Sequence, residues 1–167
     1  MALVKKIGKY IIDKKEATLS FRSDYNAGKN IVIGGRKKVV NANNDAAVSE
    51  TLTEEEYPSG TVFSLDMNAA TNDIAYTLPA LTAGLEYTFL VSTTAGSGVT
   101  LTISAPSAVL EGVAMCDNGQ EDISGTNFII AATKAELGTQ INVISDGTLW
   151  YMKAFCKCVI ADVSSTN

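Results

Sequence analysis

Residues 85–104 have the sequence LEYTFLVSTTAGSGVTLTIS, in which apolar and polar side chains alternate over two short runs. Every second residue from Leu85 to Val91 is apolar, and so is every second residue from Val99 to Ile103. Side chains of a β-strand point alternately to its two faces, so each run is predicted to be a strand with one buried face. The short turn-forming segment between the runs predicts that they pair as a hairpin.

The same rhythm continues from Thr51 to the end of the chain, where short apolar runs alternate with turn residues. Asp146-Gly147 is the strongest hairpin signal, and it predicts a returning strand over 149–158 with Trp150 inward and Tyr151 outward. Residues 111–125 are predicted to form a loop, and no solenoid repeat is evident in the sequence. These patterns predict an all-β fold, either an antiparallel β-sandwich of jelly-roll-like form or a barrel.

The N-terminal part of the chain has a different character. Residues 1–48 are predicted to form an extended basic arm, and residues 49–167 the β-domain. Within the arm, the apolar pairs around Gly34-Gly35 predict a short hairpin over residues 31–40. The polar residues 41–50 are predicted to be a linker.

The composition excludes several kinds of chemistry. The chain has 167 residues, of which 46% are hydrophobic and 19% charged, as in globular proteins, but none is histidine. Catalytic systems that pair histidine with serine or cysteine are therefore excluded, as is zinc bound by histidine. We expect no enzymatic activity and no cofactor. The first residues lack the apolar core of a signal peptide, so we expect synthesis in a cytoplasm and no membrane partner.

Charge is distributed unevenly along the sequence. Residues 1–40 hold ten basic and three acidic residues, a net charge of +7, and the remainder holds three lysines and fifteen acids, a net charge of −12. Such asymmetry indicates association with a partner rather than a particular fold. The basic residues that we expect to contact a partner or an adjacent subunit are Lys5, Lys6, Lys9, Lys14, Lys15, Arg22, Arg36, Lys37 and Lys38.

Nucleic acid is an alternative partner for this arm. Its aromatic residues Tyr10, Phe21 and Tyr25 lie among the basic ones, where they would stack on bases. The acidic remainder would repel a polyanion, so the sequence favours an acidic protein surface as the partner.

Three cysteines, Cys116, Cys156 and Cys158, raise the alternative of a thiolate metal site. Residues 156 and 158 would share one face of a strand, and Cys116 would be a third ligand. Zinc in closed structural sites has four ligands, and no fourth is evident. Cysteine is also among the most frequently buried residues, so the sequence favours a packing role and no metal.

Two groups of carboxylates are candidates for catalysis or calcium binding. Consecutive side chains of Glu54–Glu56 point in different directions, and a threonine precedes them, so a capped and solvated turn is favoured. Asp117, Glu121 and Asp122 would act in a catalytic pair only at a specific distance from another carboxylate. Their spacing in the sequence says nothing about that distance, so an acidic surface loop is favoured.

Three segments resemble small structural proteins of bacteriophages. They are SETLTEEEYPSGTVFSL over residues 49–65, TLPALTAGLEYTFLV over 77–91, and SDGTLW over 145–150. Together with Leu101-Thr102-Ile103 they place the resemblance over about residues 49–155. The resemblance is to virion β-modules, and in particular to capsid decoration proteins, also called cement proteins.

The resemblance implies a β-sandwich or jelly-roll-like module that assembles as a homotrimer on the outer capsid surface. The partner would be the major capsid protein, and the function would be to stabilise contacts between capsomers. A tail or head-fibre module that binds a host surface receptor is the alternative. The basic residues 1–40 lie outside the resemblance.

Overall fold

The computed structural model describes residues 4–7, 10–13, 18–21, 30–32, 38–43, 48–68, 72–96, 98–105 and 109–166. The chain divides into two compact units, Met1–Lys37 and Lys38–Asn167. Each is described by itself.

The first unit contains a four-stranded antiparallel sheet rather than an extended arm. Its strands pair in chain order, β1 (Val4–Ile7), β2 (Tyr10–Asp13), β3 (Thr18–Phe21) and β4 (Asn30–Val32). The glycines that predicted a hairpin near residue 34 lie outside the described residues.

The predicted hairpin over residues 31–40 is wrong. Strand β4 pairs with β3, whereas β5 (Val39–Asn43) pairs with β7 (Thr61–Asp66) in the second unit. The predicted linker over residues 41–50 instead contains the end of β5 and the start of β6 (Val48–Thr51). The division between the units therefore lies ahead of the expected boundary after residue 48, because pairing with β7 includes β5 in the second unit.

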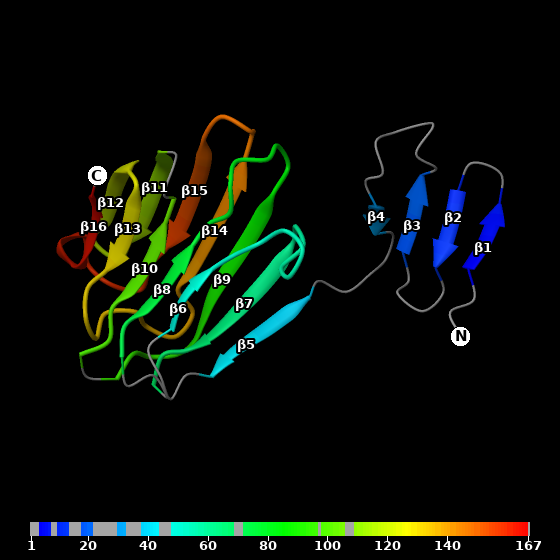
Figure 1. Ribbon diagram of the computed structural model, residues 1–167. Helices are drawn as coiled ribbons and strands as arrows, with labels where there is room; N and C mark the ends of the chain where they lie inside the picture. Colours follow the sequence, from blue (N-terminus) through cyan, green and yellow to red (C-terminus); the bar gives the residue numbers. More distant parts are fainter. Residues whose placement is uncertain are drawn as a thin grey trace. The chain divides into compact units, whose positions relative to one another are not determined.

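The second unit is a β-sandwich, which confirms the predicted fold class (Figure 1). Its two sheets are mixed rather than purely antiparallel. The five-stranded sheet has the order β16-β13-β10-β8-β6, and the seven-stranded sheet the order β12-β11-β15-β14-β9-β7-β5. The remaining strands are β8 (Ile74–Thr77), β9 (Glu86–Thr93), β10 (Leu101–Ser104), β11 (Leu110–Cys116), β12 (Gly119–Gly125), β13 (Asn127–Ile130), β14 (Gln140–Ser145), β15 (Trp150–Phe155) and β16 (Val163–Thr166).

From β5 to β10 the chain winds between the two sheets. Successive strands alternate between the sheets, so β5, β7 and β9 are parallel neighbours in one sheet and β6, β8 and β10 in the other. Parallel neighbours require a crossover, and here each crossover includes a strand of the opposite sheet. The predicted hairpin between residues 85–92 and 99–104 is therefore wrong. Both apolar faces are buried as predicted, but they face the core from opposite sheets.

Beyond β10, hairpins replace the winding. Asp146-Gly147 joins the antiparallel pair β14 and β15 as predicted, and Gly147 has the positive φ of 93° that the turn requires. The predicted loop over residues 111–125 is wrong, because those residues form most of the antiparallel hairpin β11–β12. A short 3₁₀-helix, η1 (Ile160–Asp162), precedes the last strand.

Phe63 lies at the centre of the aromatic part of the core. Its ring centre is 5.0 Å from that of Phe89, 5.1 Å from Tyr76, 5.2 Å from Tyr57 and 6.3 Å from Tyr87. Tyr76 belongs to the five-stranded sheet, whereas Phe63, Tyr87 and Phe89 belong to the seven-stranded sheet. The cluster therefore joins the two layers. The hydroxyl of Tyr87 is satisfied within it by donating to the Tyr57 carbonyl oxygen at 2.9 Å.

Replacement of Phe63 tests the importance of this cluster. Phe63→Ala is expected to lower the free energy of unfolding by about 3–5 kcal/mol, because the cavity would lie between two sheets that cannot both collapse into it. Urea denaturation measures this change. Leu137→Ala, at a side chain that is 54% exposed, is the control and is expected to change stability by less than about 0.5 kcal/mol. Equal effects of the two substitutions would contradict the assignment.

Candidate functional site

The basic residues predicted to contact a partner are only partly within the described residues. Lys5 and Lys6 lie on β1, and Lys38 directly precedes β5. Those outside the described residues are Lys9, Lys14, Lys15, Arg22, Arg36 and Lys37.

Lys38 has partners within its own unit. Its Nζ donates to the Glu56 carbonyl oxygen at 2.7 Å and lies 5.0 Å from the ring centre of Tyr57. The Tyr57 hydroxyl in turn donates to the Glu50 carboxylate, which raises the pKa of Tyr57. These contacts tie Lys38 to the segment between β6 and β7.

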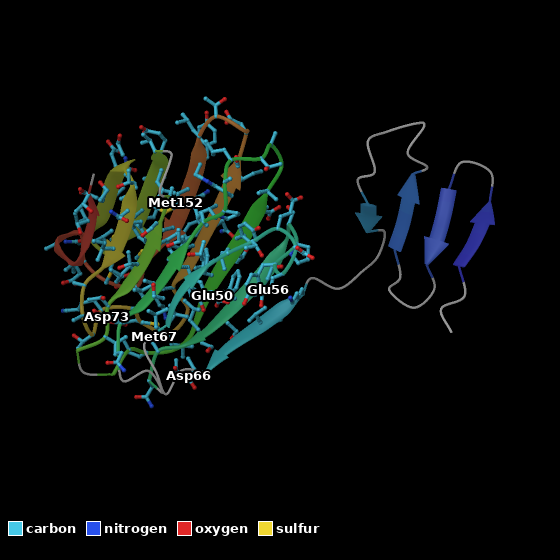
Figure 2. All side chains as sticks on the ribbon, viewed as in Figure 1. Glu50, Glu56, Asp66, Met67, Asp73 and Met152 are labelled. Carbon is cyan, nitrogen blue, oxygen red and sulfur yellow. The ribbon has the colours of Figure 1, made fainter. Side chains whose placement is uncertain are left out.

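The Glu54–Glu56 segment forms the capped turn that the sequence predicted. All three residues are exposed, the Glu56 amide donates to Thr53 Oγ1 at 3.3 Å, and the Tyr57 amide donates to the Thr53 carbonyl oxygen at 2.8 Å. Figure 2 shows Glu56 in this turn and Glu50 on the neighbouring strand β6. The turn is structural.

The outward face of the seven-stranded sheet carries exposed apolar side chains on β11, β14 and β15. In β15, Trp150 and Met152 are buried, whereas Tyr151 and Phe155 point outward and are 45% and 43% exposed. The prediction that Trp150 points inward and Tyr151 outward is confirmed. The neighbouring strands add two more exposed apolar side chains, Met115 on β11 and Ile144 on β14.

The strand register places these side chains in two cross-strand pairs. Ile144 is paired with Tyr151 across β14 and β15, and Phe155 is paired with Met115 across β15 and β11. Lys153 lies between Tyr151 and Phe155 along the strand, and its Nζ is 5.1 Å from the Phe155 ring centre. We call the four residues Met115, Ile144, Tyr151 and Phe155 the outer face. The sequence analysis missed it, although apolar residues on both faces of WYMKAF are its signal.

Asp146 holds the turn beside the outer face. Its carboxylate accepts hydrogen bonds from the amides of Leu149 at 2.9 Å and Thr148 at 2.7 Å, and from the Tyr151 hydroxyl at 3.2 Å. The two amides are the main reason that the pKa of Asp146 lies below its ordinary value. The contact with Asp146 also raises the pKa of Tyr151. Asp146 therefore links the turn geometry to the position of Tyr151.

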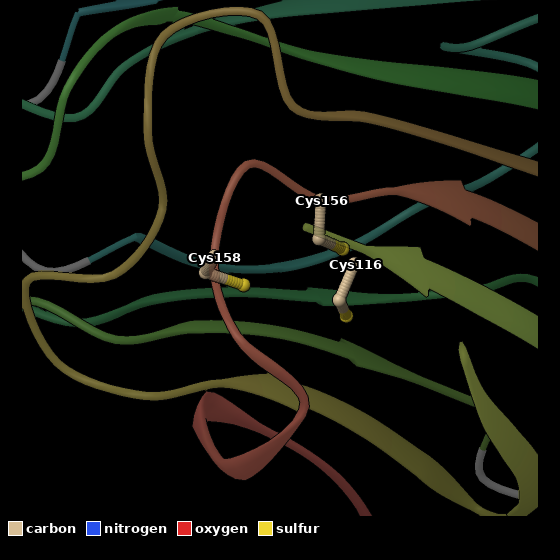
Figure 3. A group of neighbouring side chains, drawn as sticks. All are labelled: Cys116, Cys156 and Cys158. Atoms are coloured by element: carbon tan, nitrogen blue, oxygen red, sulfur yellow. The ribbon is translucent and has the colours of Figure 1, made fainter. Parts of the chain in front are cut away.

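A second feature is a cluster of three thiols at the end of the same two strands (Figure 3). Cys116 ends β11, Cys156 directly follows β15, and Cys158 comes two residues later. The three sulfur atoms lie within 4.8 Å of one another. Cys156 and Cys158 are buried, Cys116 is partly exposed, and all three are free thiols.

Main-chain hydrogen bonds hold the segments that carry the thiols. The Cys156 amide donates to the Met115 carbonyl oxygen at 2.8 Å, and the Asp117 amide donates to the Cys158 carbonyl oxygen at 3.0 Å. These two bonds lie on either side of Cys116 in the sequence. These backbone hydrogen bonds therefore fix the relative positions of the segments that carry the three thiols.

Burial raises the pKa of all three cysteine thiols above its ordinary value, that of Cys158 to about 12. Nearby carboxylates act in the same direction, Asp162 on Cys158, and Asp117 and Glu121 on Cys116. Among the described residues, these thiols are the one group of three cysteine or carboxylate side chains close enough to share an ion. The carboxylates at 117–122 do not form such a group.

Comparison of the sequence with models of protein families finds no match, and comparison with characterised proteins finds no significant similarity. No helix in the part of the chain that the structure describes has the length and apolar character needed to cross a membrane. The structural basis for assigning a function is therefore the geometry of the outer face and of the thiol cluster.

The role of Asp146 predicts a specific dependence of stability on pH. Because its pKa is lower in the folded protein, its charge stabilises the fold above the unfolded pKa of about 3.9, and this stabilisation is lost as the pH falls through the folded value. Wild-type protein should be more stable than Asp146→Asn at about pH 6, and the difference should disappear in strong acid. Urea denaturation across this range measures it. Glu55→Gln, an exposed carboxylate in another turn, is the control. A difference independent of pH would contradict this role.

Proposed function

We propose that this chain is a structural protein of a bacteriophage virion, of the capsid decoration or cement type. It would bind the outer capsid surface through the major capsid protein and stabilise contacts between capsomers. The proposal is of a binding protein without catalytic activity. The virion setting rests on the resemblance of residues 49–155 to virion β-modules.

The observation that carries a binding role is the outer face. Four large apolar side chains, each 43–49% exposed, lie on three adjacent strands of a rigid sheet. Exposed apolar residues grouped on one face of a protein mark sites of association, and aromatic side chains such as Tyr151 and Phe155 contribute strongly to such interfaces. Because the sheet positions them, little conformational entropy is lost when they dock.

The charge distribution supports a second contact. The first unit is basic and the sandwich is acidic, so each is complementary in charge to the other unit of a neighbouring copy and to capsid surfaces of the opposite sign. A homotrimer would repeat both contacts around its axis. Each added contact then strengthens attachment through a raised effective concentration, which is how a small protein would tie several capsomers together.

The direct test is binding to capsids that lack the protein. Purified protein would be mixed with such shells and sedimented, and bound copies would be counted across a salt series. We expect saturable binding at hundreds of copies per particle, weakened by salt because basic residues contribute. A handful of copies per particle would favour the tail or head-fibre alternative instead, and no binding would contradict the proposal.

Variants of the outer face separate its contribution from that of charge. Tyr151→Ala and Phe155→Ala are each expected to weaken capsid binding about tenfold, the loss expected of an interface hot spot. Val39→Ala, exposed on β5 at the far edge of the same sheet, is the matched control and should bind as wild type. Equal binding by all three variants would exclude the outer face as the docking surface.

A charge variant tests the basic unit. Neutralising Lys5, Lys6, Lys9, Lys14 and Lys15 together to glutamine should weaken binding and flatten its salt dependence, because fewer charge contacts would form. Lys157→Gln, a change in the acidic unit, is the control. Unchanged affinity and salt dependence in the five-lysine variant would exclude this unit from capsid contact.

A further inference from the structure

The three-thiol cluster has a geometry that packing alone does not require. Buried cysteines that serve as small apolar residues need contacts with the core, not with one another. Here three thiols from two segments 40 residues apart in sequence converge, and their sulfur atoms lie within 4.8 Å of one another. A disulfide would use two of them and leave the third unexplained.

We propose that Cys116, Cys156 and Cys158 bind a divalent ion of the zinc class as three thiolates. Sulfur atoms bound to one zinc ion at about 2.3 Å lie about 3.8 Å apart in tetrahedral geometry. The sulfur atoms would therefore need to approach by about 1 Å at most, a movement that side-chain rotation supplies without a change in the backbone.

The surroundings favour a divalent ion over a monovalent one. Asp117, Glu121 and Asp162 add negative charge around the thiols. Three thiolates with a monovalent ion would leave a net charge of −2 in this acidic setting, whereas a divalent ion leaves −1, which costs less to bury. With three protein ligands the site would be open rather than closed, and a water molecule would take the fourth position, as it does at zinc sites with three protein ligands. Cys116, the most exposed of the three, places that fourth position at the surface.

The ion would act as a structural clamp. It would join the end of β11 to the turn after β15, which the Cys156–Met115 and Asp117–Cys158 hydrogen bonds already hold together. Binding exchanges protons for metal: one divalent ion and three thiols give a three-thiolate complex and release three protons. Because the ion binds only the folded arrangement, it stabilises the fold.

The test uses the full-length, reduced and metal-free protein. Titration with Co²⁺ should give one equivalent bound, a thiolate-to-cobalt charge-transfer band and the visible absorption of tetrahedral cobalt, and Zn²⁺ should abolish both signals by displacement. A pH indicator should register close to three protons released per ion. The melting temperature of the protein should rise with Zn²⁺.

Cys116→Ser is the decisive variant because its partly exposed side chain is the least required for folding. It should retain the circular dichroism spectrum of the wild type, bind Co²⁺ at least tenfold more weakly and lose the four-coordinate spectrum of the wild type. Val159→Ala, at an exposed side chain next to Cys158 in the sequence, is the control and should bind Co²⁺ as the wild type does.

Three results would overturn the proposal. The first is no binding of Co²⁺ or Zn²⁺ by the reduced protein. The second is wild-type binding by Cys116→Ser. The third is binding of Cu⁺ alone, which would show that the site is built for a monovalent ion. None of these results depends on capsid binding, so the site stands or fails independently of the proposed function.

Discussion

The contact between the two sheets at Phe63 is the interaction that holds the sandwich together. Neither sheet can bury its apolar face alone, and the aromatic rings of Phe63, Phe89 and Tyr76 meet between them at centre distances near 5 Å. The Tyr57 and Tyr87 hydroxyls of this cluster find acceptors, so these aromatic residues contribute area without leaving those polar atoms unsatisfied. A rigid interior of this kind is what makes an outward sheet face usable as a docking surface.

The winding of the first six strands of the sandwich follows from the same constraint. A chain that crosses to the opposite sheet after every strand buries one apolar face at each crossing, and each turn of the winding sets a strand parallel to its neighbour in the same sheet. The hairpins beyond β10 complete the seven-stranded sheet with β11, β12, β14 and β15. Strands β5 to β10 therefore form part of both sheets of the sandwich, and strands of the later hairpins carry the outer face and the thiol cluster.

Strands β11 and β15 contribute to both candidate sites because they are parallel neighbours that end at the same edge. Their outward residues include Met115, Tyr151 and Phe155, and their ends carry the thiols. The pair is also unusually close, since a Cβ at Gly112 would lie 1.9 Å from the Met152 carbonyl oxygen. Only glycine fits there, because a side chain at residue 112 would overlap the main chain of Met152.

Local patterns in the amino-acid sequence were enough to predict most strands of the sandwich, their buried faces and the Asp146-Gly147 hairpin, because alternation and turn chemistry involve near neighbours. Local patterns also predicted the capped turn at Glu54–Glu56 and the inward orientation of Trp150. Only the tertiary structure decides which strands are neighbours. The apolar face of a strand is buried equally well whether the next strand pairs with it in a hairpin or lies in the opposite sheet. The predicted hairpins at residues 31–40 and 85–104 failed for that reason. The outer face and the thiol cluster depend on the register between β11 and β15, whose residues are 40 positions apart, and no local pattern encodes a pairing over that distance.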